Sequence, residues 1–198
     1  MSQETWLRVV FAVVVFTMLG IRAYYRRRAA QSEGAVQYKE SRLNIAIQWF
    51  LAIGGMLAIL AYVIRPSWIA WAALPLPLWL RWLAALVGVV SLPLLVWVQR
   101  ELGNNFSTVL HVHSKQTLVT SGPYRTVRHP MYTVLFLLAL SMMLIAANWS
   151  IGFFWLGGLL AIVGPRIRRE EAVMLEQFGD QYRDYMRRTN RFLPRLAR

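Results

Sequence analysis

Five apolar stretches, each close to the length needed to cross a lipid bilayer, constrain this chain more than any other feature of its sequence. They lie at about 6–21, 43–64, 78–98, 131–147 and 149–164. The hydrocarbon core of a bilayer is about 30 Å thick, which a helix crosses in roughly 20 residues, or about 17 at the short end. Hydrophobic residues make up 57% of the 198 residues, more than one water-soluble domain of this length would bury. The sequence therefore predicts an all-α membrane protein with five transmembrane helices, forming one domain over 1–198.

Two expectations come from the residues that border these stretches. The fourth and fifth stretches are joined only by Ala147-Asn148-Trp149, a link that fits a helical hairpin with its turn at the membrane surface. The first stretch is followed by the basic cluster Arg26-Arg27-Arg28, whereas a cleavable signal peptide has its basic residues in front. We therefore expect the first stretch to remain in the mature chain.

Basic residues are divided unequally between the two sides of the predicted spans. With the N-terminus outside, the inner segments 22–42, 99–130 and 166–198 hold 6, 4 and 9 Lys and Arg residues, and the outer side holds 3. Cytoplasmic loops of membrane proteins carry the excess of Lys and Arg. The sequence predicts a multi-pass integral membrane protein with its N-terminus outside and its C-terminus in the cytoplasm.

The charge and the residue types argue against several classes of protein. The net charge is +13, but the basic residues flank apolar spans and do not gather on one soluble face with aromatic stacking platforms, so we expect no nucleic-acid partner. The chain has no cysteine, which removes thiolate catalysis and cysteine-ligated metals. His111 and His113 are two of only three histidines, a weak ligand set, so we expect no metal.

Polar residues that a simple bundle does not need gather in 99–130 and after Pro165. In the first of these regions Gly122-Pro123 predicts a tight turn, and Pro130 is suited to the first position of a helix. The free N–H groups of that helix, next to Arg128 and His129, would favour an anionic group such as a carboxylate. His129 could instead simply cap the helix.

Helical periodicity after Pro165 places one carboxylate among apolar neighbours. The stripe consists of Ile167, Glu171, Met174, Leu175, Phe178, Tyr182 and Tyr185. An unpaired carboxylate there would be costly, so Glu171 should have a cationic or hydrogen-bonding partner. Arg166 and Glu170 lie four residues apart and could pair as an ordinary surface bridge. Gly179 should end or bend the helix.

The two polar regions together carry a recognisable pattern. Its blocks are Leu118-Val119-Thr120-Ser121-Gly122-Pro123-Tyr124, then Arg128-His129-Pro130 with Tyr132, then Arg166, and then Glu170-Glu171 with Leu175, Phe178, Gly179, Tyr182 and Tyr185. In this order they closely resemble the isoprenylcysteine carboxyl methyltransferase family, over roughly 99–194, and phospholipid N-methyltransferases look similar over the same blocks. The resemblance implies an integral-membrane enzyme that binds S-adenosylmethionine in a cytosolic pocket formed by 99–130 and 166–194. It also implies a lipid-bearing acceptor that enters from the bilayer.

The resemblance further implies a role for individual residues. Carried over by position, the cofactor-binding residues are Gln116, Leu118, Val119, Gly122, Pro123, Tyr124, Arg128, His129, Tyr132, Glu170 and Glu171. Glu171 would hold the cofactor's ammonium group and Arg166 would orient the acceptor, which makes these two the catalytic residues. Gln116 stands where family members usually carry a histidine, so that contact is altered or replaced, conceivably by His111 or His113.

The expected reaction is methyl transfer to a lipid-embedded or lipid-modified acceptor, most simply a carboxylate such as that of an isoprenylcysteine. A carboxylate needs no general base, whereas an amine must lose a proton to Glu170, Glu171 or His129. A phospholipid, small amine or thiol methyltransferase remains an alternative. So does a membrane-embedded NADPH-dependent lipid reductase. A transporter is disfavoured because the interiors of the spans hold no ionisable residue.

Overall fold

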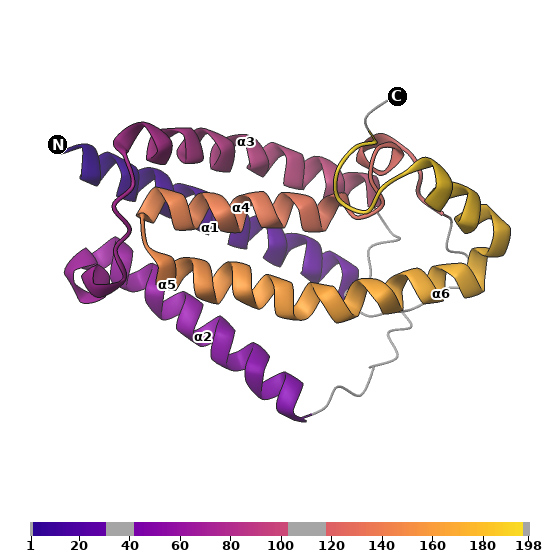
Figure 1. The fold of residues 1–198 in the computed structure, drawn as a ribbon, viewed down its shortest axis with the longest axis horizontal. Coiled ribbons are helices and arrows are strands. Elements are labelled where there is room, and N and C mark those ends of the chain that lie inside the picture. The colour runs from indigo at the N-terminus through magenta and orange to yellow at the C-terminus, as the bar shows by residue number, and fades with distance from the viewer. Residues whose placement is uncertain (1, 31–41, 103–117, 196–198) are drawn as a thin grey trace. The chain divides into compact units, whose positions relative to one another are not determined.

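The computed structural model describes residues 2–30, 42–102 and 118–195, and long helices dominate them (Figure 1). The α-helices are α1 (Gln3–Ala30), α2 (Arg42–Ile64), α3 (Leu78–Leu102), α4 (Pro130–Ala146), α5 (Trp149–Gly152) and α6 (Gly158–Arg188). Shorter helical turns are η1 (Pro66–Ala72), η3 (Gly122–Arg125) and the π-helical η4 (Phe153–Gly157), which joins α5 to α6. The prediction of an all-α protein is confirmed.

Among the described residues, four helices are long and apolar enough to cross a membrane by length and composition: Gln3–Arg28, Asn44–Ile64, Leu78–Leu102 and Trp149–Arg188. The predicted stretch at 131–147 does form a helix, but with 17 residues it is the shorter apolar helix Pro130–Ala146. A fifth span at that helix therefore stays a prediction. The predicted stretch at 149–164 is not a separate helix, because the helical run continues past Pro165 to Arg188.

The chain divides into two compact units, which are described separately. The first contains Met1–Gly20, Glu40–Pro93 and Leu135–Ile162, and the second contains Ile21–Lys39, Leu94–Val134 and Val163–Arg198. Helices α1, α3, α4 and α6 each contribute residues to both. Each unit is therefore built from three segments that are distant in the sequence.

The first unit has an apolar core of aliphatic side chains and one aromatic pair. Leu7, Phe11, Ile59, Leu138 and Met142 are fully buried. The ring of Phe11 meets the ring of Tyr62 edge to face, with centroids 4.8 Å apart. Such pairs stabilise a core by about 0.5–1.5 kcal/mol beyond the area that they bury.

Two glycines let α2 pack closely against the π-helical turn η4. A Cβ atom on Gly54 would lie 2.2 Å from the ring of Phe154, so no larger residue fits without displacing that ring. At the next position the indole N–H of Trp155 donates to the carbonyl of Gly55 at 3.4 Å. The small residues therefore determine how closely these two elements approach.

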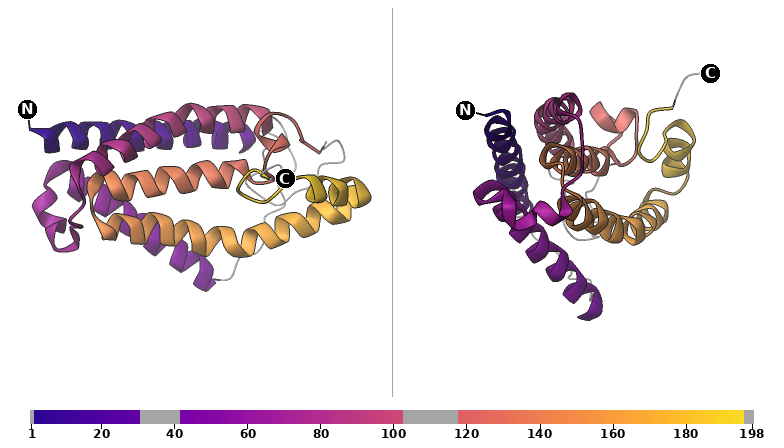
Figure 2. Two further views of the ribbon diagram at one scale, coloured as in Figure 1. Left: turned by 45° about the horizontal axis from the view of Figure 1, so that its top comes forward. Right: turned by 60° about the vertical axis from the view of Figure 1, so that its left-hand side comes forward.

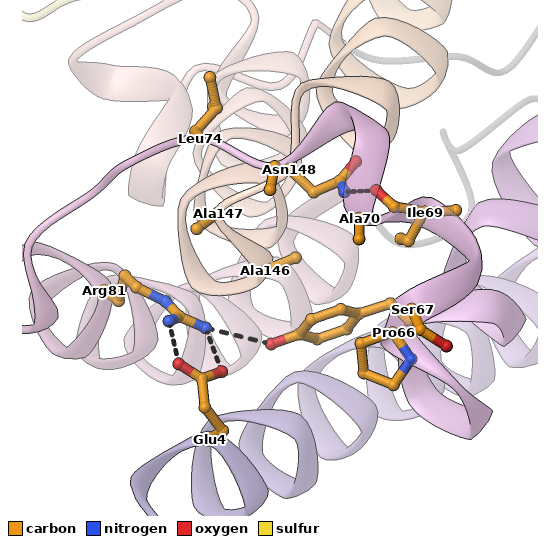
Figure 3. Close-up of a pocket in the computed structure, with 12 residues that line it drawn as sticks. Glu4, Pro66, Ser67, Ile69, Ala70, Leu74, Arg81, Ala146, Ala147 and Asn148 are labelled. Atoms are coloured by element: carbon orange, nitrogen blue, oxygen red, sulfur yellow. Dashed lines mark hydrogen bonds and ion pairs between the residues drawn. The ribbon is translucent and has the colours of Figure 1, made fainter.

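The predicted hairpin between α4 and α5 is confirmed. Ala147 adopts φ +47°, in the left-handed region, and Asn148 caps α5 by accepting from the Ser150 N–H at 3.1 Å. The Asn148 amide donates to the Ile69 carbonyl at 2.8 Å (Figure 3), which ties the hairpin turn to η1.

A small cavity of about 290 Å³ lies beside this hairpin turn (Figure 3). Its charged lining residues are Glu4 and Arg81. Arg81 is only 8% exposed, and both its terminal nitrogens bond the carboxylate of Glu4, one of them at 2.8 Å. Arg81 also donates to the Ile145 carbonyl at 3.0 Å. The charge is therefore neutralised within the unit.

The second unit is organised by the bend in α6. Gly179 adopts φ +49°, and the helix changes direction there, as predicted (Figure 1). Ile167, Glu171, Tyr182 and Tyr185 of the predicted stripe are buried. After Arg188 the chain returns to the turn that precedes α4 (Figure 2).

Candidate functional site

All features of the candidate site belong to the second unit, and the site begins at the turn formed by Gly122. This residue adopts φ +54°, and a Cβ atom on it would lie 2.8 Å from the Cδ atom of Glu101. Glycine is therefore required both by conformation and by space. The hydroxyl of Ser121 donates to the same carboxylate, and Pro123 opens the short turn η3, as the sequence predicts.

Tyr124 anchors this turn to the far end of α6. The Tyr124 side chain is 8% exposed, and burial raises the pKa of its phenol. Its carbonyl accepts from the Tyr185 hydroxyl at 2.6 Å. The loop before α4 and the segment after Pro165 are thus joined directly.

Backbone pairing extends the same junction. The N–H of Arg128 donates to the Asn190 carbonyl at 2.8 Å, and the N–H of His129 donates to the Arg191 carbonyl at 2.9 Å. The Arg128 guanidinium donates to the carbonyls of Met186, at 3.1 Å, and Thr189. A guanidinium that bonds the last carbonyls of a helix also suits the negative end of its dipole.

Glu171 is the most heavily paired carboxylate in the described residues. It is 5% exposed, and Arg191 approaches it through Nη2 at 2.6 Å and through Nε at 3.1 and 3.2 Å. The Nε atom of Arg128 lies 3.3 Å from it. The prediction that Glu171 has a cationic partner is confirmed, and these bonds raise the pKa of Arg191.

Arg191 was not singled out from the sequence. It lies 20 residues after Glu171, beyond the bend at Gly179, so no helical spacing connects the two. The available signal was only the requirement that a buried carboxylate be paired.

His129 lies between the two acidic side chains. Its Nδ1 is 3.8 Å from Glu170 and its Nε2 is 3.4 Å from Glu171, and its side chain is 10% exposed. Burial lowers the pKa of His129 in spite of these carboxylates, so the ring is neutral at neutral pH. Within the described residues Nε2 has no properly aligned hydrogen bond. Nε2 therefore retains an unused donor or acceptor.

Glu170 connects α4 to α6. Its Oε1 accepts from the Tyr132 hydroxyl at 2.7 Å and from Arg166 Nε at 2.8 Å. The predicted pair between Arg166 and Glu170 is confirmed, but it is more than a surface bridge because Tyr132, which is 7% exposed, shares the same oxygen.

The structure thus brings six of the predicted residues into one chain of contacts: Arg128, His129, Tyr132, Arg166, Glu170 and Glu171. Tyr124 is attached to them through Tyr185, while Leu118 and Val119 are half-buried residues shortly before the turn. Gln116, His111 and His113 lie outside the described residues. No group of three potential metal ligands occurs in the described part of the chain.

The arrangement can hold a ligand that carries both charges. A desolvated cluster of arginines and carboxylates offers partners for a carboxylate and for an ammonium group, and the buried Nε2 of His129 offers a further polar contact. The Arg191 side chain is 49% exposed, so solvent screens its pair with Glu171. These residues fit an amino-acid moiety such as that of S-adenosylmethionine.

Comparison with known proteins confirms the resemblance found in the sequence. The profile of the isoprenylcysteine carboxyl methyltransferase (ICMT) family matches residues 82–176. A protein-S-isoprenylcysteine O-methyltransferase of Dictyostelium discoideum is 30% identical over 126 residues, which cover 60% of this chain and 52% of that protein. The corresponding protein of Schizosaccharomyces pombe is 33% identical over 98 residues, covering 48% and 41%.

One solved structure has a similar fold. The eukaryotic intramembrane Ras methyltransferase ICMT superposes with a TM-score of 0.54 at 22% sequence identity, covering 80% of this chain and 54% of that one. The chain therefore spans about half the length of the relatives that it matches, or less.

Proposed function

We propose that this chain is a methyltransferase of the isoprenylcysteine carboxyl methyltransferase family, which uses S-adenosylmethionine to methylate a lipid-modified carboxylate. The observation that carries the proposal is the junction of two distant segments, in which His129 lies 3.4 Å from Glu171 and 3.8 Å from Glu170. The family match over 82–176 includes all three of these residues. A multi-pass membrane protein agrees with the four long apolar helices.

In this proposal the cofactor's amino-acid moiety binds at the buried charged cluster. Glu171 receives the ammonium group in exchange for Arg191, and Arg128 with the turn at Gly122 faces the carboxylate. Replacing Arg191 by the ammonium group costs little free energy, because the Arg191 side chain is half-exposed and a partly exposed ion pair contributes about 1 kcal/mol or less. His129, neutral because it is buried, donates or accepts through Nε2 without competing for the positive charge.

Methyl transfer from S-adenosylmethionine requires mainly alignment, because the cofactor supplies a methyl group on a positively charged sulfur. When bound, it would supply that methyl group to a carboxylate oxygen, the bond between methyl and sulfur would break, and S-adenosylhomocysteine would leave. The carboxylate would use its own electron pair, so no proton would have to be removed. Arg166 is suited to orient that carboxylate, and Glu170 fixes the guanidinium at 2.8 Å. We therefore propose an isoprenylcysteine carboxylate as the acceptor.

The test is methyl transfer by the full chain in lipid nanodiscs with labelled S-adenosylmethionine and an S-farnesylated cysteine. The proposal predicts a base-labile methyl ester. A parallel reaction with phosphatidylethanolamine tests the amine alternative. Label in the phospholipid, with none in the prenylated cysteine, would overturn the carboxylate assignment.

A further inference from the structure

Arg22 is a charged residue on α1 that the sequence patterns did not single out, and it lies in the same unit as the candidate site. It is partly buried, yet among the residues that the structure describes its guanidinium donates only to the sulfur of Met131, through Nη1 at 3.8 Å. A thioether is a weak, uncharged acceptor. Within the described residues no carboxylate lies within 4.0 Å of Arg22.

Met131, the partner of Arg22, is next in sequence to the charged cluster of Arg128, Tyr132, Arg166, Glu170, Glu171 and Arg191. Met131 is followed by Tyr132, whose hydroxyl bonds Glu170, and Glu170 in turn bonds Arg166. The charges of Arg22 and Arg166 act on each other and on the Tyr132 phenol. Arg22 therefore extends the cluster by one cation on the side formed by α1.

Arg22 differs from the arginines of the charged cluster. Arg128, Arg166 and Arg191 each pair with Glu170 or Glu171, whereas Arg22 forms no ion pair within the described residues. A partly buried guanidinium without a counterion is costly, and a ligand anion would relieve that cost. The ligand also has to reach a helix that is apolar over most of its length, which favours an anion attached to a lipid.

We infer that Arg22 binds the anionic group of the lipid-modified acceptor, forming with Arg166 a two-arginine site for its carboxylate. The inference rests on the proposed function, since it assigns a residue to that function's acceptor. Arg22 contributes binding and orientation, while the cofactor site around Glu171 stays intact. The same chemistry would fit the phosphate of a lipid headgroup, and the test separates the two.

The experiment measures equilibrium binding of three prenylated probes to the full chain in nanodiscs made of neutral lipids. The probes are an S-farnesylated cysteine with a free carboxylate, the same compound as a carboxamide, and farnesyl phosphate. Wild-type protein is expected to prefer the carboxylate to the carboxamide by roughly tenfold to hundredfold, the range for one charge-assisted hydrogen bond. Arg22→Gln should lose most of that preference and keep only the part that Arg166 supports, and Arg22→Lys should restore part of the loss.

Arg27→Gln is the matched control, because it removes the same charge from an exposed position on the same helix. It should keep the preference, and both variants should bind S-adenosylmethionine within about twofold of wild type. A preference that is as large in Arg22→Gln as in wild type, or that is absent from wild type, overturns the inference. A preference for farnesyl phosphate alone overturns the carboxylate assignment in favour of a lipid headgroup.

Turnover distinguishes this inference from the proposed function. If Arg22→Gln raises the KM for the farnesylated cysteine roughly tenfold with little change in kcat, both hold. If wild type shows the binding preference but forms no methyl ester, the proposed methyltransferase function is wrong, while the inference that Arg22 binds the anionic group of a lipid is retained.

Discussion

At the scale of single residues, the site depends on a buried carboxylate whose partner can be exchanged. Glu171 is 5% exposed, whereas the side chain of its main partner Arg191 is 49% exposed. Burial makes an ion pair strong only when both partners are held in place. We therefore propose that Glu171 receives another cation, with Arg128 beside it in either state.

Replacing this carboxylate tests its role. Glu171→Gln should weaken S-adenosylmethionine binding at least about tenfold, a loss of roughly 1.4 kcal/mol or more, because the amide cannot neutralise an ammonium group. Isothermal titration on detergent-solubilised protein measures the affinity. Glu176→Gln, on an exposed face of the same helix, should bind as wild type does. Equal affinities in all three proteins would refute the assignment of Glu171.

Arg166 should affect the acceptor and not the cofactor. We expect Arg166→Ala to lose at least about a hundredfold in methyl-ester formation while its S-adenosylmethionine affinity stays within about twofold, because a clamp on the attacking group acts in the transition state. Parallel measurement of turnover and of cofactor affinity checks this. An equal loss of both would mean that Arg166 supports the cofactor site.

His129 predicts a pH dependence of stability. Burial lowers its pKa below the ordinary value of 6.5, so the unfolded chain binds more protons than the folded chain once the pH falls through that value. Stability is then lost toward lower pH, by at most about 1.4 kcal/mol per pH unit. Between pH 7.5 and 5, the thermal unfolding midpoint of wild type should fall further than that of His129→Gln. Parallel curves would show that His129 does not titrate differently in the two states.

At the scale of elements, close packing between α2 and η4 depends on one glycine. Gly54→Ala places a methyl group 2.2 Å from the Phe154 ring and should destabilise the protein by about 1–3 kcal/mol. Gly20→Ala, on α1, meets no atom within 4 Å and should be neutral or stabilising by up to about 1 kcal/mol, because alanine favours helix. Unfolding midpoints in detergent measure both.

Phe154→Leu offers a further check, since a smaller, flexible side chain should recover part of the stability lost in Gly54→Ala. If Gly54→Ala were as stable as Gly20→Ala, the contact between α2 and η4 would be looser than the structure shows.

The sequence predicted the helices better than their ends. Apolar length detects the part of a helix that crosses a bilayer, so the stretch at 6–21 was recognised, but α1 extends over Gln3–Ala30 because polar residues continue a helix beyond the membrane. Turn chemistry predicted Gly122, Pro130 and Gly179 correctly, since each requirement is local. The continuation of the helix past Pro165 was not predicted, because a proline inside a helix removes a backbone hydrogen bond and favours a break.

The charged contacts were less predictable than the helices. The pair of Arg166 with Glu170 follows from helical spacing, and the need for a partner at Glu171 follows from its apolar stripe. Which cation satisfies Glu171 depends on how the chain returns after the bend at Gly179. Likewise, Arg22 is separated from Met131 by 109 residues, and no sequence pattern connects them.

At the scale of the whole molecule, the distribution of basic residues predicts the orientation in the membrane. The inner segments hold 6, 4 and 9 of the Lys and Arg residues and the outer side holds 3, so the C-terminal segment should face the cytoplasm. Since the chain has no cysteine, single cysteines can report this directly. Ser67→Cys should react with a membrane-impermeant thiol reagent in intact cells, and Asp180→Cys only after lysis. The reverse pattern would contradict the orientation.

The proposed methyltransferase requires that two segments far apart in the chain form one site for a methyl donor. Titrating the full chain in nanodiscs with S-adenosylmethionine and, separately, with NADPH examines that requirement most directly. We predict saturable binding of S-adenosylmethionine that S-adenosylhomocysteine displaces, and no binding of NADPH. Saturable binding of NADPH without any binding of S-adenosylmethionine would contradict the account and favour a lipid reductase.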